Sequence, residues 1–269
     1  MTPLKNVCHE VRQQIIELSF KAGQNNAHMG GSLSAVEIVA TLYYHHLRWN
    51  NGLDPNRDRF IMSKAHASLV QYCVLSQLGR IDKSQLEAFE QNGSIFTAHA
   101  RKEPQMGLEF SGGSLGLGLS YATGVALALK KRHSGAHVYV LLGDGECDEG
   151  LVWEALMFAS HHNLNNLTVI IDHNHLQADG FVEEVMNTAD LCKKLQAFGF
   201  NTQQVDGHSV DALDQAFLAR RTDMSNAIVA ETVKGKGVRF MENKYNWHFT
   251  VLSESKYHKA IDELNQLQQ

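Results

Sequence analysis

The 269-residue chain is 43% hydrophobic and 20% charged, which supplies enough apolar material for a full core and argues against a disordered protein. Its net charge is −5 at pH 7, and no block of lysine or arginine forms the basic patch typical of nucleic-acid binding. No apolar run reaches the roughly 18 residues that cross a bilayer, and the start lacks an apolar leader. We therefore expect a cytoplasmic globular protein without nucleic-acid or membrane partners.

The sequence predicts one continuous domain, because it holds only three prolines and no linker rich in glycine and serine. We expect this domain to cover residues 1–269, with a helical amino-terminal part at 1–112, an α/β core at 113–233 and a closing segment with a helix at 234–269. The four cysteines are far apart and form no CxxC pair, which predicts reduced thiols rather than a disulfide framework or a zinc site.

The amino-terminal part carries apolar residues at helical spacing and is expected to be mainly helical. A Gly-Gly-Ser sequence at 30–32 is a start signal for the second helix. The predicted helices of this part cover residues 7–22, 34–47, 69–78 and 84–91.

From Gly113 onward, helical segments alternate with short apolar runs rich in β-branched residues. The expected helices are 120–131, 152–161, 189–197 and 210–219, with a helical tail in 253–269. The expected strands are 138–142, 167–172, 201–205 and 227–233. This alternation predicts an α/β fold with a parallel sheet and helices on both faces, in which ligands bind beyond the carboxyl ends of the strands.

The densest acidic cluster is the turn LLGDGECDEG at 141–150, which directly follows a predicted strand. Asp144 ends this strand and Asn174 ends the next, so a helix separates two polar residues at equivalent strand ends. Adjacent parallel strands lie about 5 Å apart, a gap that one cation bridges through oxygen ligands, as Mg²⁺ or Ca²⁺ prefers. Taken alone, the sequence also fits a tight turn with Asn174 as a strand-end cap.

The same turn suits a phosphate group. Gly143 and Gly145 would let the backbone approach a diphosphate closely. The helix that follows presents its first N–H groups and the positive end of its dipole to the same anion. We therefore expect the acidic turn to hold a metal ion, and the metal ion to hold a diphosphate.

The longer run GDGECDEGLVWEALMFASHHNLNNLTVIIDHNHLQADG resembles the thiamine diphosphate motif, in the form found in the transketolase family. The resemblance implies the thiamine-diphosphate-binding (PP-type) fold. It also implies that Asp144, Asn174 and the backbone carbonyl of Leu176 bind Mg²⁺, for which Ca²⁺ or Mn²⁺ could substitute. Gly145, Glu146 and Asn174 would contact the cofactor.

Further blocks resemble the same family, so that the resemblance covers nearly the entire chain. NNAHMGGSLSAVEI contains His28 and TAHARKEP contains His99, which the resemblance places near the substrate. DRFIMSKAHASL and KGKGVRFMENKYNWHF contain His66 and His248, which would face the diphosphate. Each histidine alone is better explained as a surface or hydrogen-bonded core residue, but four at family positions in the right order favour a site.

Two more matches concern the cofactor and a partner chain. SGGSLGLGLSYATGVALA resembles the segment whose backbone lies along the thiamine rings, with Gly113, Ser114 and Leu115 at the contacting positions. Glu149 matches an acid that hydrogen-bonds towards the catalytic glutamate of the partner chain. A solvated acid at a helix start is an equal alternative for Glu149.

Four positions depart from the family pattern. Ala100 stands where a proline usually follows the histidine, Leu117 replaces a polar residue, and Ala65 and Phe249 replace glycines. These changes crowd the cofactor channel or its mouth, and we expect them to affect acceptor preference more than cofactor binding.

The resemblance covers only the diphosphate-binding half of a complete transketolase. It implies the amino-terminal subunit of a split enzyme, assembled as α₂β₂ with a separate carboxyl-terminal subunit that supplies the activating glutamate. Such an enzyme transfers a two-carbon ketol unit from a ketose, or ketose phosphate, to an aldose by means of thiamine diphosphate.

Three alternatives stay open. One is the α subunit of another thiamine diphosphate enzyme, such as a 2-oxoacid dehydrogenase, which shares GDG but is not expected to combine it with the SKAH, GSLGLG and KGKG blocks. A nicotinamide-dependent oxidoreductase would need a G-x-G-x-x-G sequence after the first strand of a βαβ unit, and no such arrangement occurs. The third is a non-catalytic relative on the same fold.

Overall fold

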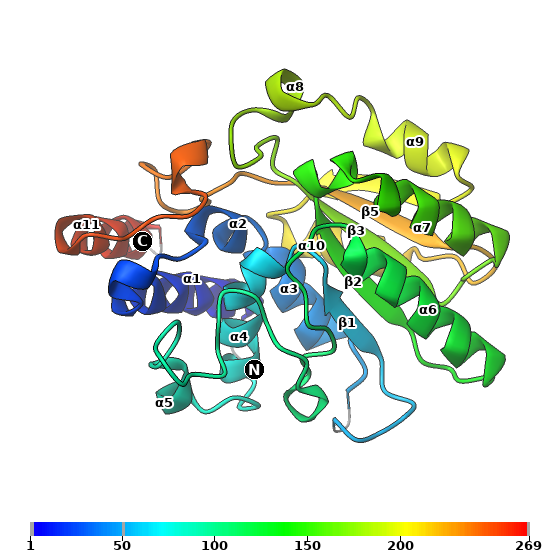
Figure 1. The fold of residues 1–269 in the computed structure, drawn as a ribbon, viewed down its shortest axis with the longest axis horizontal. Helices are drawn as coiled ribbons and strands as arrows, with labels where there is room; N and C mark the ends of the chain where they lie inside the picture. Colours follow the sequence, from blue (N-terminus) through cyan, green and yellow to red (C-terminus); the bar gives the residue numbers. More distant parts are fainter. Residues whose placement is uncertain (1–2, 50–51, 268–269) are drawn as a thin grey trace.

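The fold is organised around one parallel sheet with five strands in the order β1–β2–β3–β5–β4 (Figure 1). The structure is a computed structural model and describes residues 3–49 and 52–267. The strands are β1 Arg59–Met62, β2 Val138–Gly143, β3 Leu167–His173, β4 Asn201–Asp206 and β5 Asn226–Glu231. The predicted α/β fold with a parallel sheet is confirmed.

Helices cover both faces of this sheet (Figure 1). The α-helices are α1 Leu4–Lys21, α2 Met29–Ser34, α3 Val36–Thr41, α4 Ser68–Gln77, α5 Lys83–Leu86, α6 Leu117–Lys131, α7 Gly150–His161, α8 Val182–Val185, α9 Leu191–Ala197, α10 Val210–Leu218 and α11 Glu254–Gln266. No helix in the described part of the chain has both the length and the apolarity needed to cross a membrane.

The side chains of β2 alternate between two buried clusters, one on each face of the sheet. In β2, Val138, Val140 and Leu142 belong to one buried cluster, whereas Tyr139 and Leu141 belong to the other. Successive side chains of a strand point to opposite faces. In β2 the residues that point to either face are apolar. The strand is therefore hydrophobic throughout, as expected for a parallel strand buried on both sides.

Different helices close the two faces. The cluster on one face includes side chains from α6, α7 and α9, and Figure 1 shows α6 and α7 lying side by side against the sheet. The cluster on the other face joins the amino-terminal helices with α10 and α11. The closing helix α11 packs beside α1, so that the first and the last helix of the described chain lie on this side.

The amino-terminal part is not only helical, which corrects the sequence prediction. Arg59–Met62 forms β1, an edge strand that pairs with β2 from Arg59 opposite Val138 onward. Its four residues are too few to show a β pattern, and the helical segments around it dominate the periodicity. The strand matters for function because Lys64 and His66 follow directly at its carboxyl end.

Helix boundaries also differ from the prediction in three places. The helix expected at 34–47 is instead α2, α3 and a five-residue π-type turn, with the first break at Ala35. The helix expected at 84–91 is the single turn α5, and α8 was not predicted. Ser34 ends α2 where its hydroxyl donates to Asp172, so a tertiary contact fixes this break.

Candidate functional site

A cavity of about 290 Å³ opens at the carboxyl ends of β2 and β3. The chain brings most of the predicted site residues to its wall: His28, His66, His99, Gly113, Leu115, Asp144, Gly145, Glu146, Asn174, Leu176 and His248. Two predicted residues, Ser114 and Glu149, do not line it and are exposed. Their predicted roles therefore concern groups outside this wall.

The acidic turn and the loop after β3 touch one another. Gly143 pairs with Asp172 in the sheet, so the residues that follow on both strands lie side by side. The Asp144 carboxylate accepts hydrogen bonds from the backbone N–H of Gly145 at 2.8 Å and of His175 at 2.5 Å. The backbone between β3 and Leu176 is thereby held against the acidic turn, as the strand-end argument predicted.

A buried ion pair lies beneath these loops. The Lys64 ammonium contacts the Asp172 carboxylate and donates to the Gly31 carbonyl at 3.0 Å. Asp172 also accepts from Ser34 Oγ at 2.6 Å and Asn174 Nδ2 at 3.2 Å. Burial alone would raise the pKa of Asp172, but Lys64 and these hydrogen bonds hold it below its usual value. Asp172 is thus a supporting carboxylate that orients the Asn174 amide.

Asp144 forms no ion pair of this kind with any residue that the structure describes. Burial raises its pKa, and the nearby Asp172 carboxylate raises it further. A buried carboxylate with a carboxylate neighbour is stabilised by a cation, and the Asn174 amide and the Leu176 carbonyl are the neutral oxygen ligands that Mg²⁺ accepts. The donor set therefore fits a hard divalent ion.

Two lysines complete the positive side of the cavity, and neither was predicted. Lys64 lines the wall beside Gly31, and Lys234 donates to the carbonyls of Leu176 at 3.2 Å and Gln177 at 2.9 Å. Burial, followed by the nearby Lys64 ammonium, lowers the pKa of Lys234 to about 8. Both lysines stand inside the SKAH and KGKG blocks, which were the available sequence signal for them.

Two glycines leave room for a ligand to approach the backbone. A Cβ at Gly31 would lie 3.4 Å from His66 Nε2 and 3.6 Å from Lys64 Nζ, inside the polar wall. A Cβ at Gly145 would lie 2.8 Å from Gln177 Cγ. Side chains at these positions would fill the space between the lysine, the histidine and the acidic turn. The cradle thus fits an anionic group such as a diphosphate.

Four histidines from four separate segments meet at the cavity. The ring centroid of His28 lies 5.3 Å from that of His66, 5.7 Å from that of His99 and 5.4 Å from that of His248. Nδ1 of His28 and Nδ1 of His248 are buried and have no hydrogen-bond partner within the described chain. Buried polar atoms are normally paired, so these two atoms are suited to a bound molecule.

Three of these histidines are neutral near pH 7. Burial lowers the pKa of His28 to about 4 and that of His248 to about 3, and it holds the pKa of His66 well below its usual value. After burial, the neighbour that lowers the pKa most is His99 for His28, Lys234 for His248 and Lys64 for His66. A neutral imidazole both donates and accepts, which suits hydrogen bonding to a polar substrate.

Glu146 lines the cavity, but both of its carboxylate oxygens are used by the chain itself. They accept from the backbone N–H of Gly116 at 2.8 Å and of Gly143 at 3.1 Å, and from the Ser63 hydroxyl. These contacts give Glu146 a positioning role in the structure, and its contact with the cofactor stays a prediction. Glu146 holds the loop before α6 against the end of β2.

None of the four departures from the family pattern lines the cavity, but Phe249 contacts a residue that does. Phe249 stacks on His28 with a centroid distance of 4.3 Å and is 47% exposed. Leu117, the first residue of α6, is 46% exposed, whereas Ala65 and Ala100 are buried. Phe249 stacks directly on a predicted substrate residue, so it is the strongest candidate among the four for an effect on acceptor choice.

Comparison with known proteins agrees with the fold. The model of the family described as transketolase, thiamine diphosphate binding domain, matches residues 10–265. The chain belongs to the transketolase family, as predicted.

The most similar relatives include single subunits of transketolases. The chain is 35% identical over 267 residues to the 6-deoxy-6-sulfo-D-fructose transketolase subunit SqwG of Clostridium sp. (strain MSTE9), covering 97% of this chain and 96% of that protein. It is 34% identical over 266 residues to an apulose-4-phosphate transketolase subunit of Actinobacillus succinogenes, covering 97% and 95%. The chain thus has the length of these subunits, as predicted for the amino-terminal half of a split enzyme.

Solved structures agree. Transketolase from Leishmania mexicana has a TM-score of 0.89 with 26% identity, covering 98% of this chain and 42% of that one. Transketolase from Campylobacter jejuni has a TM-score of 0.85 with 28% identity, covering 97% and 42%. The chain therefore spans less than half the length of these solved transketolases.

Proposed function

We propose that this chain is the thiamine-diphosphate-binding subunit of a two-chain transketolase, which transfers a two-carbon ketol unit from a ketose or ketose phosphate to an aldose. The observation that carries the proposal is the cavity in which the Asp144 turn, the Asn174–Leu176 loop and buried, unpartnered histidine nitrogens converge. The full-length similarity to subunits named for 6-deoxy-6-sulfo-D-fructose and apulose 4-phosphate supports a sugar or sugar-phosphate substrate.

Asp144, Asn174 and the Leu176 carbonyl would hold Mg²⁺, with Ca²⁺ or Mn²⁺ as substitutes. Lys64 and Lys234 would bind the diphosphate through their ammonium groups, and Gly145, which has no side chain, would let the backbone come close to it. When bound, thiamine diphosphate would supply the nucleophilic carbon and the electron sink needed to break and form the C–C bond of the sugar.

The histidines would bind and orient the sugar substrate. His28 and His99 lie beside one another, and their imidazoles would hydrogen-bond to hydroxyl or carbonyl oxygens of the sugar and move protons between them. His66 and His248 lie near Lys64 and Lys234 respectively, and would orient the phosphate end. Phe249 covers His28 and would exclude water from this side of the cavity.

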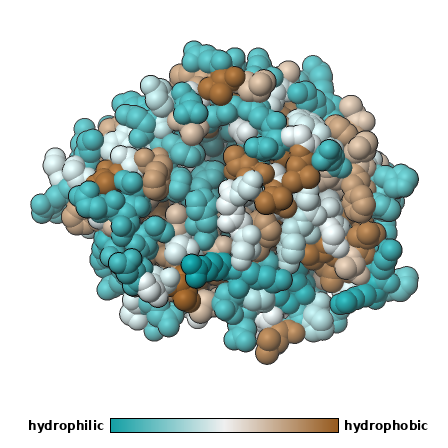
Figure 2. All heavy atoms as spheres, viewed as in Figure 1, coloured by the Kyte–Doolittle hydropathy of each residue, from teal (hydrophilic) through white to brown (hydrophobic). Residues whose placement is uncertain are grey.

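A second subunit is part of the proposal, in an α₂β₂ assembly. Exposed apolar side chains lie on the helices that start beside the cavity, namely Leu117 on α6 with Met157 and Phe158 on α7. Figure 2 shows apolar patches on the face where these helices lie. A partner seated there would reach Glu149 and Ser114, which are exposed next to the same helices.

The test is reconstitution with a separately purified carboxyl-terminal transketolase subunit. Calorimetry with thiamine diphosphate and Mg²⁺, with and without that subunit, is expected to show cofactor binding. A screen of ketose donors and aldose acceptors is expected to show ketol transfer only in the mixture. Robust turnover by this chain alone, or cofactor binding without any ketol transfer in the mixture, would contradict the proposal. The second outcome would favour a non-catalytic relative.

A further inference from the structure

A second group of ligand-type side chains lies next to the cofactor cavity but outside its wall. His173 is the last residue of β3, Glu231 is the last residue of β5, and the two are paired across neighbouring strands. His175 follows two residues after His173. None of the three lines the cavity. Sheet register therefore places these side chains together independently of the cofactor.

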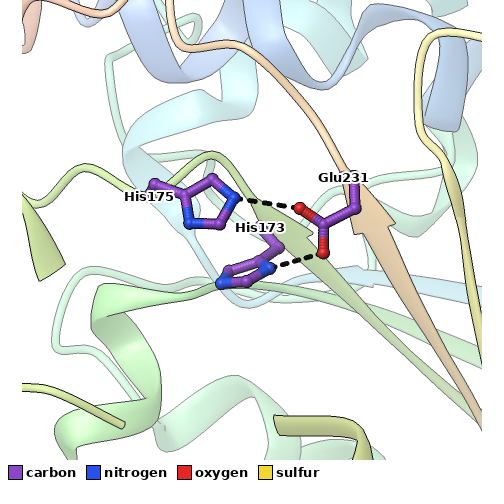
Figure 3. A group of neighbouring side chains, drawn as sticks. All are labelled: His173, His175 and Glu231. Carbon is purple, nitrogen blue, oxygen red and sulfur yellow. Dashed lines mark hydrogen bonds and ion pairs between the residues drawn. The ribbon is translucent and has the colours of Figure 1, made fainter. Parts of the chain in front are cut away.

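The three side chains converge on one point. His173 Nδ1 lies 2.8 Å from one oxygen of Glu231, and His175 Nε2 lies 2.9 Å from the other. The two imidazole ring centroids are 4.0 Å apart. Figure 3 shows both rings on the same side of the carboxylate, each with one nitrogen turned towards it. One ligand atom from each residue lies within 4.8 Å of the other two.

We propose that His173, His175 and Glu231 bind a divalent first-row transition-metal ion, of which Zn²⁺ is the test case, at a site separate from the Asp144 turn. Two imidazole nitrogens and one carboxylate form a ligand set that Zn²⁺ accepts, whereas Mg²⁺ prefers oxygen ligands alone. The side chains of His175 and Glu231 are 47% and 32% exposed. An ion can therefore enter from solvent and complete its coordination with water.

The surrounding structure holds these ligands in place before any ion arrives. Gln204 on β4 donates to Glu231 at 2.7 Å and fixes the carboxylate from behind. His175 has a left-handed backbone with φ of 62°, and its N–H and C=O bond to Asp144 and Val182. Supporting contacts of this kind raise metal affinity because the ligands do not have to be ordered on binding.

A second pair of histidines in the chain also shares one carboxylate, but its ligand atoms are not grouped as they are at the proposed site. His45 and His46 both contact Asp214, at 2.9 and 2.7 Å. Their ring centroids are 6.3 Å apart, and within the described residues only the His173 group has three such ligand atoms in mutual reach. The His46–Asp214 pair is thus a matched control with the same chemistry and a more open geometry.

An ion at the proposed site would tie the end of β3 to the end of β5. The loop that carries His175 also carries Asn174 and Leu176, which line the cavity. The site would therefore stiffen the outer side of the loop whose inner side belongs to the cofactor cavity.

The proposal is tested on the whole chain by calorimetry with Zn²⁺ in a buffer free of Mg²⁺ and of cofactor. We expect one Zn²⁺ per chain. Glu231→Gln and His175→Asn should each weaken binding by at least about 100-fold, since loss of even a supporting group costs roughly 10- to 100-fold. Asparagine tolerates the left-handed backbone at position 175. The control His46→Gln with Asp214→Asn should stay within about twofold of the unmodified chain.

Three results would overturn the proposal. These are no Zn²⁺ binding by the unmodified chain, undiminished binding by His175→Asn, and loss of the Zn²⁺ signal in Asp144→Asn, which would move the ion to the cavity. Circular dichroism checks the fold of each variant, and if Glu231→Gln is unfolded, His175→Asn decides alone. Co²⁺ gives a second readout, because its visible absorption should appear in the unmodified chain and vanish in His173→Gln.

Discussion

This chain has two buried polar clusters built from similar residues. They differ in how many of their polar groups have a hydrogen-bond or ion-pair partner within the cluster. Away from the cavity, Arg12 donates to both oxygens of Glu37 at 2.6 and 2.7 Å and to the Lys236 carbonyl at 3.1 Å. His208 Nε2 accepts from the Val233 N–H, so its Nδ1 carries the proton that is donated to Glu37 at 3.0 Å. Every charge in this cluster has a partner.

The cavity cluster is incomplete by comparison. Nδ1 of His28 and of His248 has no partner in the described chain, and Asp144 lacks an ion-pair partner of its own there. Buried polar groups without partners cost folding free energy, and a ligand in the cavity would supply the missing contacts. The fully paired cluster around Arg12 and Glu37 therefore stabilises the fold, whereas the cavity cluster has polar atoms left for a ligand to contact. Substitutions should separate the two.

The largest effect on stability is expected in the satisfied cluster. Arg12→Met leaves the Glu37 carboxylate buried with His208 as its remaining side-chain partner, and should lower the free energy of unfolding by about 3–5 kcal/mol. Urea unfolding measures this loss. The double variant Arg12→Met with Glu37→Leu should recover much of it, because no unpaired charge stays buried. A loss confined to cofactor affinity would contradict the assignment.

Asp144→Ala should have the opposite profile. We expect metal-dependent binding of thiamine diphosphate to fall by at least about 100-fold, since an ion ligand is lost. The free energy of unfolding should change little, because burial and Asp172 already disfavour the charged Asp144 side chain. Calorimetry with Mg²⁺ and thermal unfolding measure the two quantities. Unchanged affinity would rule out the metal assignment.

The cavity histidines should make the protein sensitive to acid. The pKa of His28 is lowered from 6.5 to about 4 and that of His248 to about 3, so between these values and pH 6.5 the unfolded chain binds protons that the folded chain does not. Stability is therefore retained above pH 6.5 and lost as the pH falls, by up to about 2 kcal/mol per histidine at about pH 5. Urea unfolding at about pH 7 and about pH 5 should show a smaller difference in His28→Gln with His248→Gln. An equal difference would contradict the burial argument.

The smallest effect is expected at Ser63. Its hydroxyl is one of three donors to the buried Glu146 carboxylate, and Ser63→Ala should cost about 0.5–1.5 kcal/mol of folding free energy. Because Glu146 holds the loop at Gly116, cofactor affinity should also weaken, although by less than in Asp144→Ala. Thermal unfolding and calorimetry on the same preparation give both values. A loss of affinity as large as that of Asp144→Ala would mean that Glu146 contacts the ligand directly.

The sequence by itself determined the α/β class and the strand ends that bear Asp144 and Asn174. Apolar runs broken by turns are a local signal, and the order of strands and helices limits the topology to a parallel sheet. The motif blocks extended this to the family and to most residues of the cavity wall, because each block is contiguous in the chain.

Only the tertiary structure decided which side chains and backbone groups from distant segments contact one another. Lys234 reaches the Leu176 carbonyl across 58 residues, β1 is recognised through its pairing with β2, and the Glu146 carboxylate accepts from the backbone N–H of Gly116. The contact between Glu231 and the two histidines likewise depends on β5 lying beside β3. Periodicity records which face of an element is buried, but the partners on that face come from packing between distant segments, which no local pattern encodes.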